Sequence, residues 1–137
     1  MTIPFIDADV IVRLISGDDP DKQKAAVALF QRVERGALQL TTPVTTLADC
    51  LYVLCSPRLY NFSRSEAVAR LLTLVQLPHF LVKDRRTVIR ALELFASVNI
   101  DFGDALIAAS MVQNASTLVY SYDQHFDQLP GITRKTP

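Results

Sequence analysis

Residues 3–12 read IPFIDADVIV, an apolar run that stops at an aspartate before a second apolar run begins. The segment from Ile3 to Ile6 is short and apolar, and it predicts a buried β-strand that ends at Asp7. Val10 to Ile15 continues apolar after the turn and predicts a helix. A buried strand that ends in a carboxylate delivers that carboxylate to the carboxyl edge of a parallel sheet, where open α/β folds place their binding sites.

The rest of the chain alternates further strands with helices. We expect strands at 38–42, 79–82 and 117–120, an edge strand around Ile132, and helices over 20–35, 47–55, 64–75, 88–95 and from 104 onward. Predicted helix caps are Asp19, Ser63, Asp84 and Asp101. This alternation predicts a single α/β domain over residues 1–137, with a central parallel sheet of four to five strands that helices cover on both faces.

The composition is that of one globular domain of ordinary size. The chain has 137 residues with 14 basic and 14 acidic side chains, so its formal net charge is zero. That balance argues against a protein that coats nucleic acid, but it allows an enzyme with a local nucleic-acid site. No apolar stretch approaches the roughly 20 residues of a membrane span, and we expect a cytoplasmic protein without a signal peptide. Cys50 and Cys55 predict buried thiols, not a disulfide.

Four aspartates lie at the edges of apolar runs, in the contexts PFIDADVIV, TTLADCLYVL, DFGDALIAAS and LVYSYDQHF: Asp7, Asp49, Asp104 and Asp123. Two follow predicted strands and two lie in the first turns of predicted helices, so we expect them to converge at one edge of the sheet. Gathered carboxylates repel one another. One or two Mg²⁺ or Mn²⁺ ions would neutralise them and leave coordination positions for a phosphate. The pattern therefore predicts a metal-dependent hydrolase of phosphodiester bonds.

Each of these aspartates also has a purely structural interpretation. Asp104 alone could be a favourable charge at a helix start, and Asp123 alone could form a turn. Asp49 fits a structural role least, because Asp is a poor helix former and is rarely buried. The histidines and cysteines are too sparse for a zinc site, with His79 in an apolar strand and His125 in a turn.

The motifs resemble those of a PIN domain, and specifically those of toxin ribonucleases of the VapBC type. FIDADVIVRLISGDDP resembles the opening motif of that family, TTLADCLYVL its second, DFGDALIAA its third and VYSYDQHF its fourth. The resemblance covers essentially the whole chain in order, and the first and third motifs are the most specific. It implies a three-layer α/β/α fold, a Mg²⁺ or Mn²⁺ site, and endonucleolytic cleavage of RNA by a metal-activated water.

The resemblance also implies roles for individual residues. The positions that match the metal-binding acids of the family are Asp7, Asp104 and Asp123. Asp49 completes the catalytic set at a position usually filled by Glu; one methylene shorter, it could act through a water. Ser121 matches a supporting hydroxyl, and Asp9 stands where Asn is frequent and could add a fifth negative charge.

Partners follow from the same resemblance. Toxins of this type act on RNA, pair with a small VapB-like antitoxin whose segment lies in a groove near the site, and commonly form homodimers. Arg13 is the preferred phosphate contact, since its helix begins at the predicted metal site and Arg matches phosphate geometry. An exposed apolar groove could be formed by Tyr52, Leu59, Tyr60 and Phe62, although core packing explains these side chains equally well.

Other functions compete with this one. A haloacid-dehalogenase-like phosphatase also has D-x-D after its first strand and a late Gly-Asp, but Ile11 stands where that family needs Thr, and Lys83 is a poor match for its lysine. A response-regulator receiver needs a late lysine after a strand, and this sequence has no lysine there. A PIN fold that keeps its acids and acts only as a binding module is distinguished from the enzyme by metal-dependent RNA cleavage that Asp7→Asn abolishes.

Overall fold

The computed structural model describes residues 2–137. Contacts divide the chain into two compact units, Met1–Arg85 and Arg86–Pro137, which we call the N-terminal and C-terminal units. Both units mix helices with short parallel strands, so the predicted α/β class is confirmed. No helix among the described residues has both the length and the hydropathy that crossing a membrane requires.

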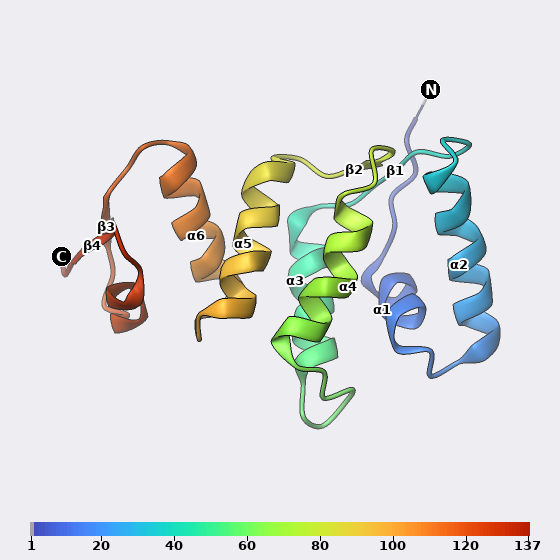
Figure 1. The fold of residues 1–137 in the computed structure, drawn as a ribbon, viewed down its shortest axis with the longest axis horizontal. Helices are drawn as coiled ribbons and strands as arrows, with labels where there is room; N and C mark the ends of the chain where they lie inside the picture. The colour runs from blue at the N-terminus through green and yellow to red at the C-terminus, as the bar shows by residue number, and fades with distance from the viewer. Residues whose placement is uncertain (1) are drawn as a thin grey trace. The chain divides into compact units, whose positions relative to one another are not determined.

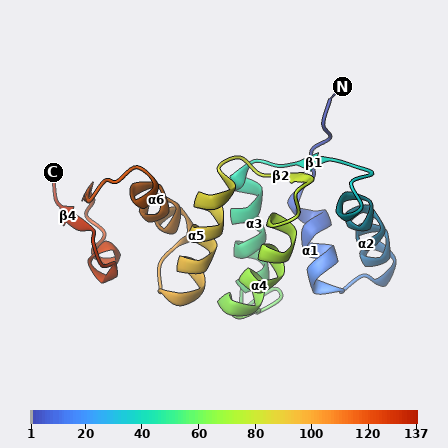
Figure 2. The same cartoon turned by 45° about the horizontal axis from the view of Figure 1, so that its top comes forward.

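The N-terminal unit is built from helices and two short strands (Figure 1): α1 (Ala8–Ser16), α2 (Pro20–Glu34), β1 (Leu40–Thr41), α3 (Val44–Cys55), α4 (Arg64–Val75) and β2 (Phe80–Leu81). β1 and β2 pair in parallel, with Leu40 opposite Phe80. In Figure 1 and again in Figure 2 the two strands lie side by side near the same end of α3 and α4. The fully buried large side chains of this unit are Ile11, Val33, Leu47, Leu51, Leu54, Leu71, Val75 and Phe80.

Hydrogen bonds to the capping residues explain where the helices of this unit begin. Asp19 accepts the backbone N–H of Lys22 at the start of α2 (3.2 Å). Ser63 accepts the backbone N–H of Glu66 at the start of α4 (3.1 Å). The predicted cap Asp84 is different, because its φ of +53° is left-handed, whereas an N-cap residue has extended backbone. Asp84 therefore precedes α5 as a turn residue, which Asp tolerates better than most residues.

The segment that leads into Asp7 is extended and is held by three hydrogen bonds. The N–H of Ile6 donates to the carbonyl of Thr41 (3.0 Å), and the N–H of Thr41 donates to the carbonyl of Pro4 (3.1 Å). The hydroxyl of Thr42, which is buried, donates to the carbonyl of Ile6 (2.9 Å). Together they fix the chain at the residue before Asp7.

The C-terminal unit contains two helices, a pair of strands and a short 3-10 helix: α5 (Arg85–Ser97, which begins at the last residue of the N-terminal unit), α6 (Phe102–Gln113), β3 (Leu118–Tyr120), η1 (Gln124–Gln128) and β4 (Thr133–Lys135). β3 and β4 pair in parallel, with Leu118 opposite Thr133, so an edge strand does form beside Ile132. Asp101 occupies the N-cap position of α6 with extended backbone but makes no side-chain capping hydrogen bond.

One feature of the predicted fold is corrected. Within residues 2–137 the strands form two separate parallel pairs, not one sheet of four to five strands, and the predicted strand at 3–6 is reduced to a single bridge between Phe5 and Thr41. Prolines give a physical reason, since a residue without an N–H interrupts the ladder. Pro4, Pro43 and Pro78 lie in or beside the segments concerned.

Candidate metal site

Asp104, Asp123 and His125 come together in the C-terminal unit. One ligand atom from each side chain lies within 4.8 Å of the other two. Asp104 is in the first turn of α6, Asp123 is the N-cap of η1, and His125 lies within η1. The two carboxylates are half-buried and the imidazole is exposed. Two of the four predicted acids therefore converge, together with a histidine that the sequence placed only in a turn.

Hydrogen bonds fix the orientation of Asp123. Its Oδ1 accepts the backbone N–H of His125 (2.9 Å) and lies 3.0 Å from Nδ1 of the same residue. Its own N–H donates to Oγ of Ser121 (2.9 Å). Arg134 donates to the carbonyl of Ser121 (3.1 Å) and forms a two-pronged ion pair with Asp127 (3.0 and 3.1 Å). Ser121, predicted as a supporting hydroxyl, thus lies directly against the backbone of Asp123.

The two carboxyl groups shift each other's titration in opposite directions. Burial raises the pKa of Asp104, and the hydrogen bond and charge of Asp123 raise it further. The pKa of Asp123 is lowered, first by the hydrogen bond from the backbone of His125 and also by the charge of that imidazole. Two neighbouring carboxylates repel each other when both are ionised. Two carboxylates and an imidazole are donors that divalent cations accept, so the residues present fit a metal site.

Asp7 and Asp49 belong to the N-terminal unit, where both lie close to the buried thiol of Cys50. Asp7 is the N-cap of α1, and its Oδ1 accepts the N–H of Ala8 (2.7 Å). Asp49 is exposed on α3, and its neighbour Cys50 places Sγ 3.9 Å from the carbonyl oxygen of Ala8. The pKa of Cys50 is raised to about 12, mainly by burial and then by the charges of Asp49 and Asp7. Both acids therefore lie close to one buried thiol.

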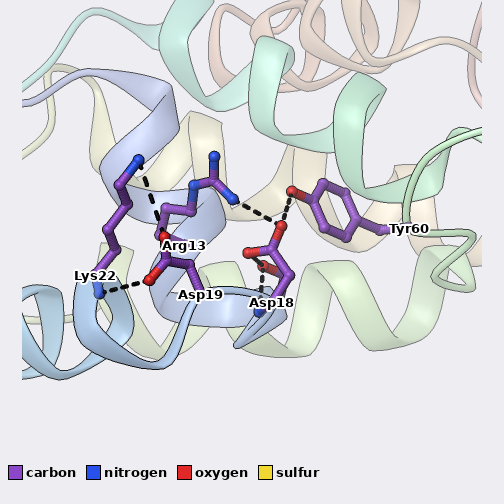
Figure 3. Close-up of polar contacts among 6 residues, drawn as sticks. Arg13, Asp18, Asp19, Lys22 and Tyr60 are labelled. Carbon is purple, nitrogen blue, oxygen red and sulfur yellow. Dashed lines mark hydrogen bonds and ion pairs between the residues drawn. The ribbon is translucent and has the colours of Figure 1, made fainter.

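The other predicted residues of α1 lie along the same helix. Asp9 is exposed in its first turn. Arg13 forms an ion pair with Asp18 (2.7 Å), and Asp18 also accepts the hydroxyls of Tyr60 (2.7 Å) and Ser16 (2.9 Å), as Figure 3 shows for the labelled residues. These bonds, that of Tyr60 first, lower the pKa of Asp18 to about 2. The guanidinium of Arg13 is thus engaged, and its phosphate contact stays a prediction.

Asp104 and Asp123 lie together in the C-terminal unit, whereas Asp7 and Asp49 are each close enough to Cys50 in the N-terminal unit to influence its pKa. His125 is the member of this candidate metal site that the sequence did not reveal. One local signal was present, because His125 stands two residues after an aspartate that was expected to form a turn, and such turns bring the second residue back to the carboxylate.

A family model matches most of the chain. The family model described as the PIN domain matches residues 5–132, a range that includes the four predicted acids and parts of both units. A search among curated proteins found no match to the chain.

Proposed function

Because the chain belongs to the PIN domain family, we propose that it is a Mg²⁺- or Mn²⁺-dependent endoribonuclease and the toxin of a type II toxin–antitoxin pair. PIN domains are α/β proteins and are generally metal-dependent nucleases. The observation that carries the proposal is the meeting of Asp104, Asp123 and His125, with ligand atoms within 4.8 Å of one another. With RNA as substrate, the enzyme acts in the cytoplasm.

The catalytic acids in this proposal are Asp7, Asp49, Asp104 and Asp123. Asp7, Asp104 and Asp123 hold the cation, with Asp9 and Ser121 in support. Residues 1–137 act as one nuclease domain, and this is supported by a family match that continues across the boundary between the two units.

A bound divalent cation would supply Lewis acidity to a phosphodiester and would make a water more acidic. Hydrogen bonds from backbone N–H groups hold two of the proposed ligand carboxylates, Asp123 and Asp7, in place. Asp123 is held in place by the N–H of His125 on one oxygen. Asp7 uses one oxygen to cap α1, which keeps its carboxylate at the helix start. The exposed carboxylate of Asp49 can accept a hydrogen bond from water.

The proposal is tested with a fluorophore–quencher RNA and with purified total RNA, each incubated with Mg²⁺, Mn²⁺ or a chelator. We expect cleavage only with a cation, and its loss in Asp123→Asn, because Asn keeps the cap of η1 and removes the charge. Asp21→Asn is the matched control, since Asp21 is exposed in the first turn of α2. Cation binding without cleavage of any RNA would instead support a silent binding module, and hydrolysis of p-nitrophenyl phosphate would support a phosphatase.

The proposal includes an antitoxin and a second copy of the chain as partners. Tyr52 and Leu59, both expected in a groove, are 79% and 60% exposed and supply apolar surface for a partner. Tyr60 and Phe62 contribute less, because both are half-buried and Tyr60 is bonded to Asp18. A short neighbouring reading frame whose product co-purifies with the chain and stops RNA cleavage would support the toxin role. Light scattering of the purified chain tests the dimer.

A further inference from the structure

A ring nitrogen of His125 lies near the carboxylate oxygens of Asp123 and Asp104, at separations close to those between ligands of one cation. Its Nδ1 lies 3.0 Å from Oδ1 of Asp123, and one ring nitrogen lies within 4.8 Å of a carboxylate oxygen of Asp104. With ligands about 2.1 Å from an octahedral cation, adjacent ligand atoms are about 3 Å apart and opposite ones about 4.2 Å apart. The 3.0 Å separation matches that of adjacent ligands, and the 4.8 Å upper limit for the other separation lies slightly above that of opposite ligands.

We propose that His125 is a direct nitrogen ligand of the cation and makes the site prefer Mn²⁺ over Mg²⁺. This inference rests on the proposed function, because it assumes that Asp104 and Asp123 hold a cation. Mg²⁺ is bound through oxygen, whereas Mn²⁺ is a first-row transition ion that also accepts imidazole, although less strongly than Fe²⁺, Ni²⁺ or Zn²⁺. A third donor that is nitrogen therefore favours Mn²⁺ at this site.

The position of His125 is fixed by the backbone and not by its ring. Its N–H donates to Oδ1 of Asp123, which anchors the start of η1, and its side chain is 53% exposed. The ring can therefore exchange its contact with Asp123 for a contact with a cation without opening a packed core. In a purely structural role the imidazole would serve only as a hydrogen-bond partner of Asp123, and replacing it would leave the choice between the two cations unchanged.

The test compares the intact chain with His125→Gln and His125→Ala. Mn²⁺ binding is followed by loss of the free-ion EPR signal, and Mg²⁺ binding by competition with Mn²⁺. Pulsed EPR then reports whether a nitrogen nucleus couples to the bound Mn²⁺. Two controls are Gln124→Ala, an exposed neighbour in η1, and His79→Gln, the other histidine of the chain. Circular dichroism checks that each variant is folded.

We expect nitrogen coupling in the wild type and in both controls, and its loss in both His125 variants. The preference for Mn²⁺ over Mg²⁺ should fall by about tenfold or more, since even indirect partners of a ligand change affinity by about 10- to 100-fold. Bound Mn²⁺ without nitrogen coupling, or an unchanged preference in folded His125 variants, overturns the inference and leaves the proposed nuclease standing. A wild-type chain that binds neither cation overturns both.

Discussion

Replacing Thr42 with Val removes one buried hydroxyl and keeps the size of the side chain. Thr42 is 4% exposed, and among residues 2–137 it is the polar side chain found in the buried core. Its hydroxyl donates to the carbonyl of Ile6 (2.9 Å), a residue that is itself 6% exposed. In the variant this carbonyl is left without its donor, directly before Asp7.

The magnitude follows from two opposing terms. An unsatisfied buried carbonyl costs about 1–3 kcal/mol, and the additional buried methyl of Val offsets at most about 0.8 kcal/mol. We therefore expect a net loss of about 1–2 kcal/mol in the free energy of unfolding. With a urea m-value of about 1.5 kcal/mol/M, the unfolding midpoint should fall by about 1 M.

Urea unfolding followed by circular dichroism measures the loss, and amide hydrogen exchange locates it. The amides of Ile6 and Thr41 should exchange faster in Thr42→Val, because both lie in the segment that the hydroxyl fixes. Thr42→Ser is the control: it keeps the hydroxyl and loses a methyl, so these two amides should lose no more protection than the rest of the N-terminal unit. If Thr42→Val unfolds at the wild-type urea concentration with unchanged exchange at both amides, the reasoning is refuted.

Three further predictions concern charged groups. Because the pKa of Asp104 is raised in the folded protein, the metal-free protein should lose stability as pH rises above about 4 and through the folded pKa. The variant Asp104→Asn should lack this dependence on pH and be more stable than the wild type at neutral pH. Thermal unfolding in the presence of a chelator measures both effects. Asp18, with a lowered pKa of about 2, contributes stability above its usual pKa that is lost as pH falls toward 2. Tyr60→Phe should raise the pKa of Asp18 in an NMR titration and reduce this acid-sensitive contribution, and an unchanged pKa would contradict the assigned cause. Arg134→Lys keeps the charge but loses the two-pronged geometry, so the affinity of the site for Mn²⁺, measured by calorimetry, should fall. An affinity equal to that of the wild type would show that Arg134 does not position the site.

The sequence predicted most reliably what local chemistry decides. The starts of α2 and α4 were evident because Asp19 and Ser63 accept backbone N–H groups a few residues later. The extent of the strands was not evident, since pairing depends on distant partners and on where a proline interrupts the ladder. Asp84 shows the limit of the capping signal, because its residue type suits both an N-cap and a left-handed turn.

The site was predicted in the same uneven way. The pairing of Asp104 with Asp123 followed from their positions at the ends of elements, whereas the contribution of His125 depends on the short turn of η1. Arg13 was expected to contact phosphate because of its charge and its helix. The ion pair that engages it comes from Asp18 in the turn before α2, and a sequence pattern does not show which of several nearby acids an arginine will choose.

The contacts of Arg134 support the proposed role of Asp123 as a metal ligand. Arg134 is close enough for the charge of Asp123 to raise its pKa, after the larger contribution of Asp127. Both prongs of its guanidinium nevertheless go to Asp127, and a further N–H goes to the backbone carbonyl of Ser121. An ion pair with a guanidinium stabilises a carboxylate, and Arg134 gives that pair to Asp127. Asp123 instead keeps its charge beside Asp104, where burial and repulsion disfavour two ionised carboxylates, and a cation bound by both would remove that repulsion.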